Sequence, residues 1–245
     1  MGVVGPGPRE PTSPFAGVAP SERRRDALLI GLTFAAGVVD AVSYLGLGQI
    51  FTANMTGNVV FLALAVGEGN LPTALHSVAA LIAFSLGALA AGRPVPRPRP
   101  PGPWPRPATM LLGAELACMV AFAVIWATVG GGPSAGVLFA LIALSSFGMG
   151  IQNAVARHLA VPGLTTTVVT GALTGFMVDL PALGISGTAQ RRAGWAVISL
   201  FLGATLGAFL LVYARPYAPL ITVTVVALVV LIAYRTFDRL PAAKS

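Results

Sequence analysis

How this chain is organised is decided by residues 93–107, RPVPRPRPPGPWPRP. The stretch holds eight prolines and four arginines in fifteen residues. This density of proline excludes a helix and favours an extended, solvated linker. Long apolar runs lie on both sides of it, so we predict a stiff loop between two sets of apolar segments. A ligand for a proline-binding domain is the alternative.

The composition of the whole chain excludes a typical soluble protein. Of 245 residues, 56% are hydrophobic and 9% are charged, and mean hydropathy is +0.83. An ordinary soluble domain has about 25% charged residues, which supply its polar surface. A typical cytosolic enzyme, a nucleic-acid-binding module and a disordered tail are therefore excluded. The fold class that remains is an all-α polytopic membrane protein.

Enzyme signatures are missing as well. Two histidines and one cysteine, Cys118, supply neither a zinc site nor a Cys/His pair. No phosphate-binding or dinucleotide-binding glycine pattern is present. We predict a protein that is not an enzyme and carries no cofactor and no metal. The net charge of +7 comes from arginines that flank apolar runs. We interpret them as topology signals, without a nucleic-acid partner.

The apolar runs fall into two length classes. Six are long enough to cross a hydrocarbon core of about 30 Å. Two are shorter, Met55–Gly67 and Leu164–Val178. If all eight crossed, the arginine-rich loop would lie outside and break the positive-inside rule. We therefore predict six transmembrane helices and two broken or re-entrant segments, with both termini in the cytoplasm. The six crossings are Ala27–Ile50, Leu71–Gly92, Ala108–Val129, Ser134–Ala156, Ala193–Ala214 and Tyr217–Tyr234.

The same positions divide the chain into parts. We predict that residues 1–25 form a disordered cytoplasmic tail without a signal peptide, and that residues 236–245 form the C-terminal cytoplasmic tail. Residues 26–92 hold two crossings and a broken segment, the cytoplasmic loop 93–107 follows, and residues 108–129 are the third crossing. Residues 134–235 hold the other three crossings and the second broken segment.

The two halves resemble each other. Residues 33–42, TFAAGVVDAV, align with 146–155, SFGMGIQNAV, at an offset of 113. Residues 52–58, TANMTGN, align with 166–172, TTVVTGA, at an offset of 114. Each half contains three crossings, and three is odd, so the second half enters the membrane upside down. We predict two inverted three-helix repeats, an arrangement typical of secondary transporters.

The broken segments predict a binding site near the midplane. Thr52–Met55 and Thr165–Val169 are β-branched or polar, and we expect extended strand there. Helices then start at Thr56-Gly57 and Thr170-Gly171, where threonine caps and free amides attract an anionic or polar ligand. Two ordinary kinked helices are the alternative.

Polar residues within the apolar runs complete the predicted site. Asp40 is an intramembrane carboxylate, which suggests cation or proton binding. Glu115 is expected to snorkel to the interface. The Gly203-x-x-x-Gly207 pair predicts close helix packing, within the monomer or in a homodimer. The predicted substrate-binding or ion-binding residues are Asp40, Asn54, Thr56, Gly57, Asn58, Gln152, Asn153, Thr170 and Gly171.

These motifs are similar to a known family. Residues 37–45 (GVVDAVSYL), 51–58 (FTANMTGN), 150–154 (GIQNA) and 164–171 (LTTTVVTG) resemble the YoaK-like family of bacterial inner-membrane proteins. The resemblance covers residues 23–238 and implies a multi-pass protein with about six helices. It implies no activity.

Two hypotheses for function remain. The first is a transporter of a small molecule or ion, coupled to H⁺ or Na⁺ through Asp40, in the bacterial inner membrane. The alternative is a non-transporting scaffold or sensor that recruits partners through its Pro-rich loop and tails. The only partner common to both is the lipid bilayer.

Overall fold

Long helices make up nearly all of the described chain. The computed structural model describes residues 19–92, 104–164 and 188–238, and residues 170, 171, 173, 174 and 177 between them. The elements are α1 (Pro20–Gly46), α2 (Met55–Glu68), α3 (Leu71–Gly92), α4 (Arg106–Thr128), α5 (Ala135–Leu159), α7 (Thr188–Tyr213), η1 (Arg215–Tyr217), α8 (Leu220–Ala233) and η2 (Tyr234–Asp238). In lipid every backbone amide and carbonyl must be paired internally, and a continuous helix does this.

Six stretches of the described residues are long and apolar enough to span a membrane. They are α1, α3, α4, α5, α7 and a last stretch from Arg215 to Asp238 that joins η1, α8 and η2. The prediction of six long apolar helices is confirmed. At 22–27 residues each helix is about 33–40 Å long, which exceeds a hydrocarbon core of about 30 Å. Helix α2 has 14 residues and a length of about 21 Å, too short to cross.

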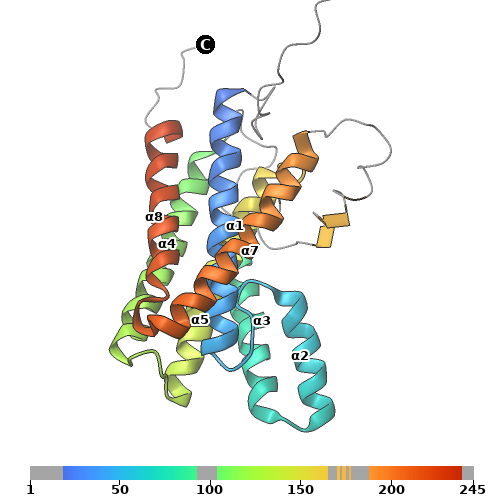
Figure 1. The fold of residues 1–245 in the computed structure, drawn as a ribbon, viewed down its shortest axis with the longest axis vertical. Helices are drawn as coiled ribbons and strands as arrows, with labels where there is room; N and C mark the ends of the chain where they lie inside the picture. Colours follow the sequence, from blue (N-terminus) through green and yellow to red (C-terminus); the bar gives the residue numbers. More distant parts are fainter. Residues whose placement is uncertain are drawn as a thin grey trace, which may run out of the picture.

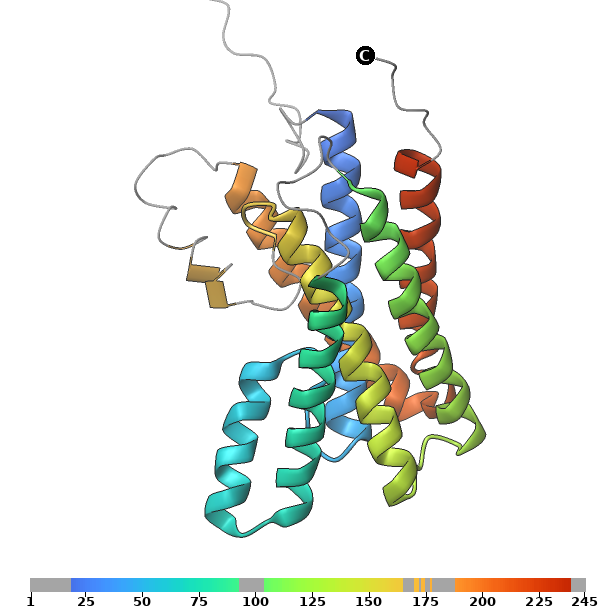
Figure 2. The same cartoon turned by 180° about the vertical axis from the view of Figure 1, so that it is seen from behind.

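The bundle has two distinct ends (Figure 1). Helices α1, α4 and α7 begin at one end, and α5 and α8 finish there, so the first and last described residues lie at the same end. The opposite end carries the turn between α2 and α3 and the loop between α4 and α5 (Figure 2). Of the arginines in the described ranges, only Arg215 lies at that opposite end. We call the other end the arginine end.

Two helix pairs make the most extensive contacts in the bundle, α1 with α7 and α3 with α5. Both pairs cross closely because glycines let the backbones touch. A Cβ on Gly37 of α1 would overlap the carbonyl oxygen of Leu200 in α7, and Gly203 of α7 faces the carbonyl of Phe34 in the same way. Gly207 adds a contact with Val38 of α1. The predicted packing role of Gly203 and Gly207 is therefore confirmed within the monomer.

The second pair repeats this arrangement. Gly150 of α5 lies against the carbonyl of Phe84 in α3, and Gly87 of α3 lies against the carbonyl of Phe147 in α5. Each crossing thus uses at least one glycine from each helix. In both pairs the phenylalanine lies three residues before a glycine of the same helix.

The chain between α1 and α2 corrects one local prediction. Thr52–Met55 was expected to be extended strand, but no strand occurs in the described residues, and residues 52 and 53 form a bend. Helix α1 ends at Gly46, four residues earlier than expected, because Gly48 (φ +83°) and Gln49 (φ +61°) adopt left-handed conformations. The second expected strand, Thr165–Val169, lies outside the described residues.

Candidate functional site

Asp40 anchors the bend between α1 and α2. It projects from α1, and its Oδ1 accepts hydrogen bonds from the backbone N–H groups of Ala53 (2.9 Å) and Asn54 (3.2 Å). Both amides lie just before α2, where no strand or helix partner is available to them. The half-buried carboxylate therefore supplies the hydrogen bonds that an extended strand would have obtained from a neighbouring strand.

Asn58 closes the same bend from the other side. This fully buried side chain accepts a hydrogen bond from the Phe51 amide at 2.9 Å and donates one to the Phe51 carbonyl at 2.5 Å. Both polar groups of one backbone residue are thus paired with one side-chain amide. The segment Phe51–Asn58 is therefore a compact polar turn held by two side chains.

The start of α2 lies close to its predicted position, but a different residue caps it. The N-cap is Asn54, whose side chain accepts from the Gly57 amide at 3.5 Å, and α2 begins at Met55. Thr56, the expected cap, lies exposed inside the first turn. Asparagine competes well for this role because its short side chain reaches the amide three residues on. Phe51 stacks beside Gly57, where a Cβ would overlap its ring.

A small pocket lies behind this turn, inside the bundle. It has a volume of about 10 Å³, room for a single water molecule, and is lined by α1, α4, α5 and the start of α8. Its walls are apolar except for the hydroxyl residues Ser43, Ser145 and Thr222. The Ser145 hydroxyl also bonds to the Thr52 hydroxyl at 2.8 Å, and both residues are buried. The polar turn and the pocket are therefore joined by one hydrogen bond.

The predicted residues of the second half lie at a different level. Gln152 of α5 is fully buried, and its Nε2 donates to the Leu32 carbonyl of α1 at 3.2 Å. Leu32 lies eight residues before Asp40 on α1, or about 12 Å along the helix. Asn153 follows Gln152 and is half-buried. The structure thus gathers Asp40, Asn54 and Asn58 but does not bring Gln152 to them.

Little of the second broken segment is described. Thr170 and Gly171 are helical and exposed, while residues 165–169 and 178–187 lie outside the described residues.

Glu115 is the polar residue whose position the sequence predicted wrongly. It was expected to snorkel, but its side chain is fully buried in α4, with its Cγ beside Gly148 of α5. Helix α4 starts at Arg106, so Glu115 lies nine residues in, about 13 Å from the end. Neither carboxylate oxygen has a hydrogen-bond partner in the structure as described. One turn further on, Met119 lines the pocket.

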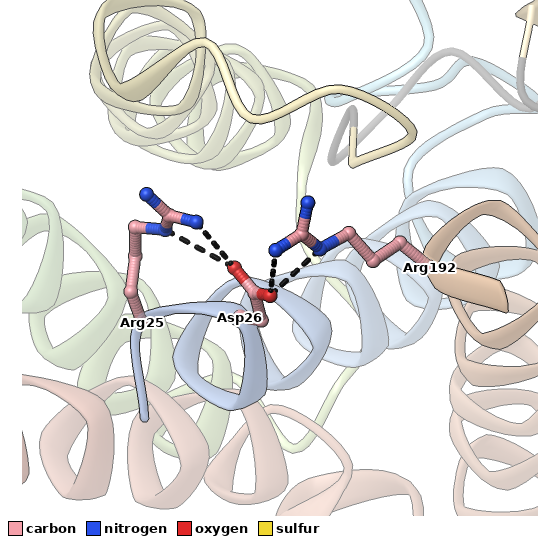
Figure 3. Close-up of polar contacts among 3 residues, drawn as sticks. All are labelled: Arg25, Asp26 and Arg192. Atoms are coloured by element: carbon pink, nitrogen blue, oxygen red, sulfur yellow. Dashed lines mark hydrogen bonds and ion pairs between the residues drawn. The ribbon is translucent and has the colours of Figure 1, made fainter. Parts of the chain in front are cut away.

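The sequence did not predict a second buried carboxylate, which belongs to Asp26 (Figure 3). Asp26 of α1 is fully buried between two arginines. Arg25 reaches its Oδ1 at 3.0 Å, and Arg192 of α7 reaches its Oδ2 at 2.6 Å. Arg192 lies 166 residues away in the sequence, so no local pattern indicated the pair. The triad joins α1 to α7 at the arginine end.

The described ranges contain no candidate metal-binding site. No three His, Cys, Asp or Glu side chains within them gather in a way that would hold a metal ion.

Six long apolar helices define a multi-pass helical membrane protein. Residues 28–233 match the family described as "Protein of unknown function (DUF1275)", and the chain belongs to this family. It is 38% identical over 156 residues to the UPF0700 transmembrane protein YoaK of Bacillus subtilis (strain 168). That match covers 64% of this chain and 67% of the relative. The similarity expected from the sequence motifs is thereby confirmed. No solved structure matches.

Proposed function

We propose that this protein is a transporter of a small molecule or ion, built from two inverted repeats, and that it is not an enzyme. The observation that carries the proposal is the matched pair of glycine crossings. Gly37 and Gly150 are 113 residues apart, the offset of the sequence repeat, and so are Phe34 and Phe147. Their partners Gly203 and Gly87 are 116 residues apart. Equivalent residues thus make equivalent contacts in α1–α7 and in α5–α3.

The directions of the helices support inversion of the second repeat. Helix α1 begins at the arginine end, whereas its counterpart α5 finishes there (Figures 1 and 2). An axis that exchanges α1 with α5 must then lie in the membrane plane, which is the plan of many secondary transporters. By the positive-inside rule we assign the arginine end, and with it both termini, to the cytoplasm of a bacterial cell.

The polar turn and the pocket supply a place for an ion, and the pocket, with a volume of about 10 Å³, must widen before it can hold a larger solute. Backbone that leaves the helix at membrane depth is tolerated where protein buries it or where it lines a cavity. Here the turn Phe51–Asn58 touches the pocket through Thr52 and Ser145. Asp40 can hold a proton or Na⁺ and at the same time set the position of the turn. Occupancy of its carboxylate would then be coupled to the shape of the pocket wall.

Transport coupled to H⁺ or Na⁺ can be measured without knowing the solute. Purified protein is reconstituted into liposomes, and H⁺ entry is followed with a trapped pH dye and Na⁺ entry with ²²Na. Wild-type protein is expected to carry one of the two ions down its gradient, with or without added solute. Asp40→Asn keeps an oxygen that can accept from Ala53 but removes the charge, so the flux should be abolished.

Glu68→Gln is the matched control, because Glu68 is an exposed carboxylate at the end of α2. It should transport like wild type. Normal flux in folded Asp40→Asn protein would exclude the coupling role. No flux from wild type under any gradient would favour the scaffold or sensor alternative, in which deletion of 93–107 abolishes function and Asp40→Asn does not.

A further inference from the structure

An open groove runs between α1 and α8 on the outside of the bundle. It has a volume of about 300 Å³ and is open to the surroundings. One face of each helix lines it, at the spacing of three and four that places residues side by side on a helix. Helix α1 contributes Arg24 and, one and two turns on, Leu28 and Gly31. Helix α8 contributes apolar side chains from Val225 to Ile232.

The groove has one charged end and is otherwise apolar. Arg24 lies in the first turns of α1, at the arginine end, and Ile232 lies in the last turn of α8 at the same end. From Arg24 to Gly31 the groove extends about 10 Å toward the middle of the bundle. Gly31 leaves room beside α8, where a Cβ would come within 3.5 Å of Val229. Its lining residues Leu228 and Ile232 are 51% and 44% exposed, so the groove faces lipid.

The charge at the mouth has no ion-pair partner among the residues that the structure describes. Arg24 is exposed and makes no ion pair or hydrogen bond with the described residues. The nearest buried acid, Asp26, is already bound by Arg25 and Arg192. Arg235, three residues after Ile232, adds a second exposed cation at the end of α8. A guanidinium without an ion-pair partner can bind an anion, and the apolar groove beside it can hold an apolar chain. A ligand that combines an anionic group with an apolar chain would therefore fit both.

We propose that this groove binds an anionic phospholipid, with the phosphate at Arg24 and one acyl chain between α1 and α8. Guanidinium groups pair with phosphate oxygens in a bidentate geometry, and van der Waals contacts with both helices hold one acyl chain in the groove. Basic pockets between transmembrane helices are known sites for anionic headgroups. A second copy of this chain would bring the same arginine to the groove and would repel the first.

The test measures lipid binding to the purified full-length protein. Native mass spectrometry follows titration with phosphatidylglycerol in detergent. Wild type should bind one phosphatidylglycerol more tightly than phosphatidylcholine. Arg24→Gln should weaken phosphatidylglycerol binding about fivefold, the effect of one interfacial cation, and Arg24→Lys should restore most of it. Arg157→Gln, which removes an exposed arginine of α5 at the same end, should bind like wild type.

A second pair of variants tests the acyl chain. Gly31→Leu fills the groove and should also weaken binding, whereas Gly113→Leu, at a glycine of α4 with open space around it, should not. If Gly31→Leu protein does not fold, Leu228→Trp narrows the same groove from its exposed side. Glycerol phosphate, which lacks the chain, should not compete. Equal binding of phosphatidylglycerol by Arg24→Gln and wild type, or competition by glycerol phosphate, would overturn the proposal.

Discussion

Two buried acidic side chains in the bundle differ in whether they have a hydrogen-bond partner. Asp26 is buried with two arginine partners, whereas Glu115 is buried with none among the described residues. A buried carboxylate costs free energy unless it is paired and hydrogen-bonded. We therefore expect Asp26 to stabilise the fold and Glu115 to destabilise it. Such violations of a local rule are expected at functional sites, and Glu115 lies one turn from the pocket.

The cost of Glu115 can be measured directly. Glu115→Met keeps the length of the side chain and removes both unpaired oxygens, so we expect a gain of about 1–3 kcal/mol in unfolding free energy. For a chain of this size that raises the apparent melting temperature in detergent by about 2–4 °C per kcal/mol. Glu68→Met, at an exposed position, should change it little. A lower melting temperature for Glu115→Met would mean that the carboxylate has a stabilising partner.

Removal of Asp26 should have the opposite effect. Asp26→Asn leaves Arg192 and Arg25 without their counter-charge, and breaking a buried pair costs about 3–5 kcal/mol. The melting temperature should fall by more than for Glu22→Gln, a change in the first turn of the same helix. Equal melting temperatures for the two variants would show that the triad contributes nothing to stability.

Pairs of elements, more than single helices, give the bundle its shape. The α1–α7 and α3–α5 crossings bring backbone against backbone at glycines. Without a hydrophobic driving force between helices in lipid, such close packing is a main source of association. Because the two crossings use equivalent residues, each should contribute a similar amount to the free energy of unfolding.

That equivalence is testable with two matched substitutions. Gly37→Ala and Gly150→Ala each force a Cβ into a facing carbonyl, so each should destabilise by about 1–3 kcal/mol. Gly113→Ala meets open space and should be neutral or slightly stabilising, because alanine favours a helix. Melting temperatures of the three variants provide the comparison. A large loss at one crossing and none at the other would argue against equivalent halves.

The sequence predicted the six long apolar helices well, because length and composition alone determine them. It predicted the turn at Phe51–Asn58 poorly. β-branching suggested a strand, but Asp40 and Asn58 pair the backbone instead, and those contacts span seven to fourteen residues. The burial of Glu115 depended on where α4 begins, and the Asp26–Arg192 pair depended on tertiary packing. The pattern of residues within one segment shows neither where a helix begins in the fold nor which distant residues pack together.

At the scale of the whole molecule, arginine placement and helix directions agree. The described arginines except Arg215 lie at one end, and the turn between α2 and α3 lies at the other, together with the loop between α4 and α5. Six crossings with a non-crossing α2, as we propose, would produce this arrangement. With eight crossings those two connections would lie on the cytoplasmic side.

Cysteine accessibility tests this central claim most directly. Cys118 is first replaced by Ala, and single cysteines are placed at Ser21, Gly69 and Gly132. Intact cells are then treated with a maleimide that cannot cross the membrane. Six crossings in two inverted halves predict labelling at Gly69→Cys and Gly132→Cys from outside, and labelling at Ser21→Cys only after the cells are opened. Labelling of Gly69→Cys and Gly132→Cys only after opening would contradict the account, because α2 would then cross the membrane.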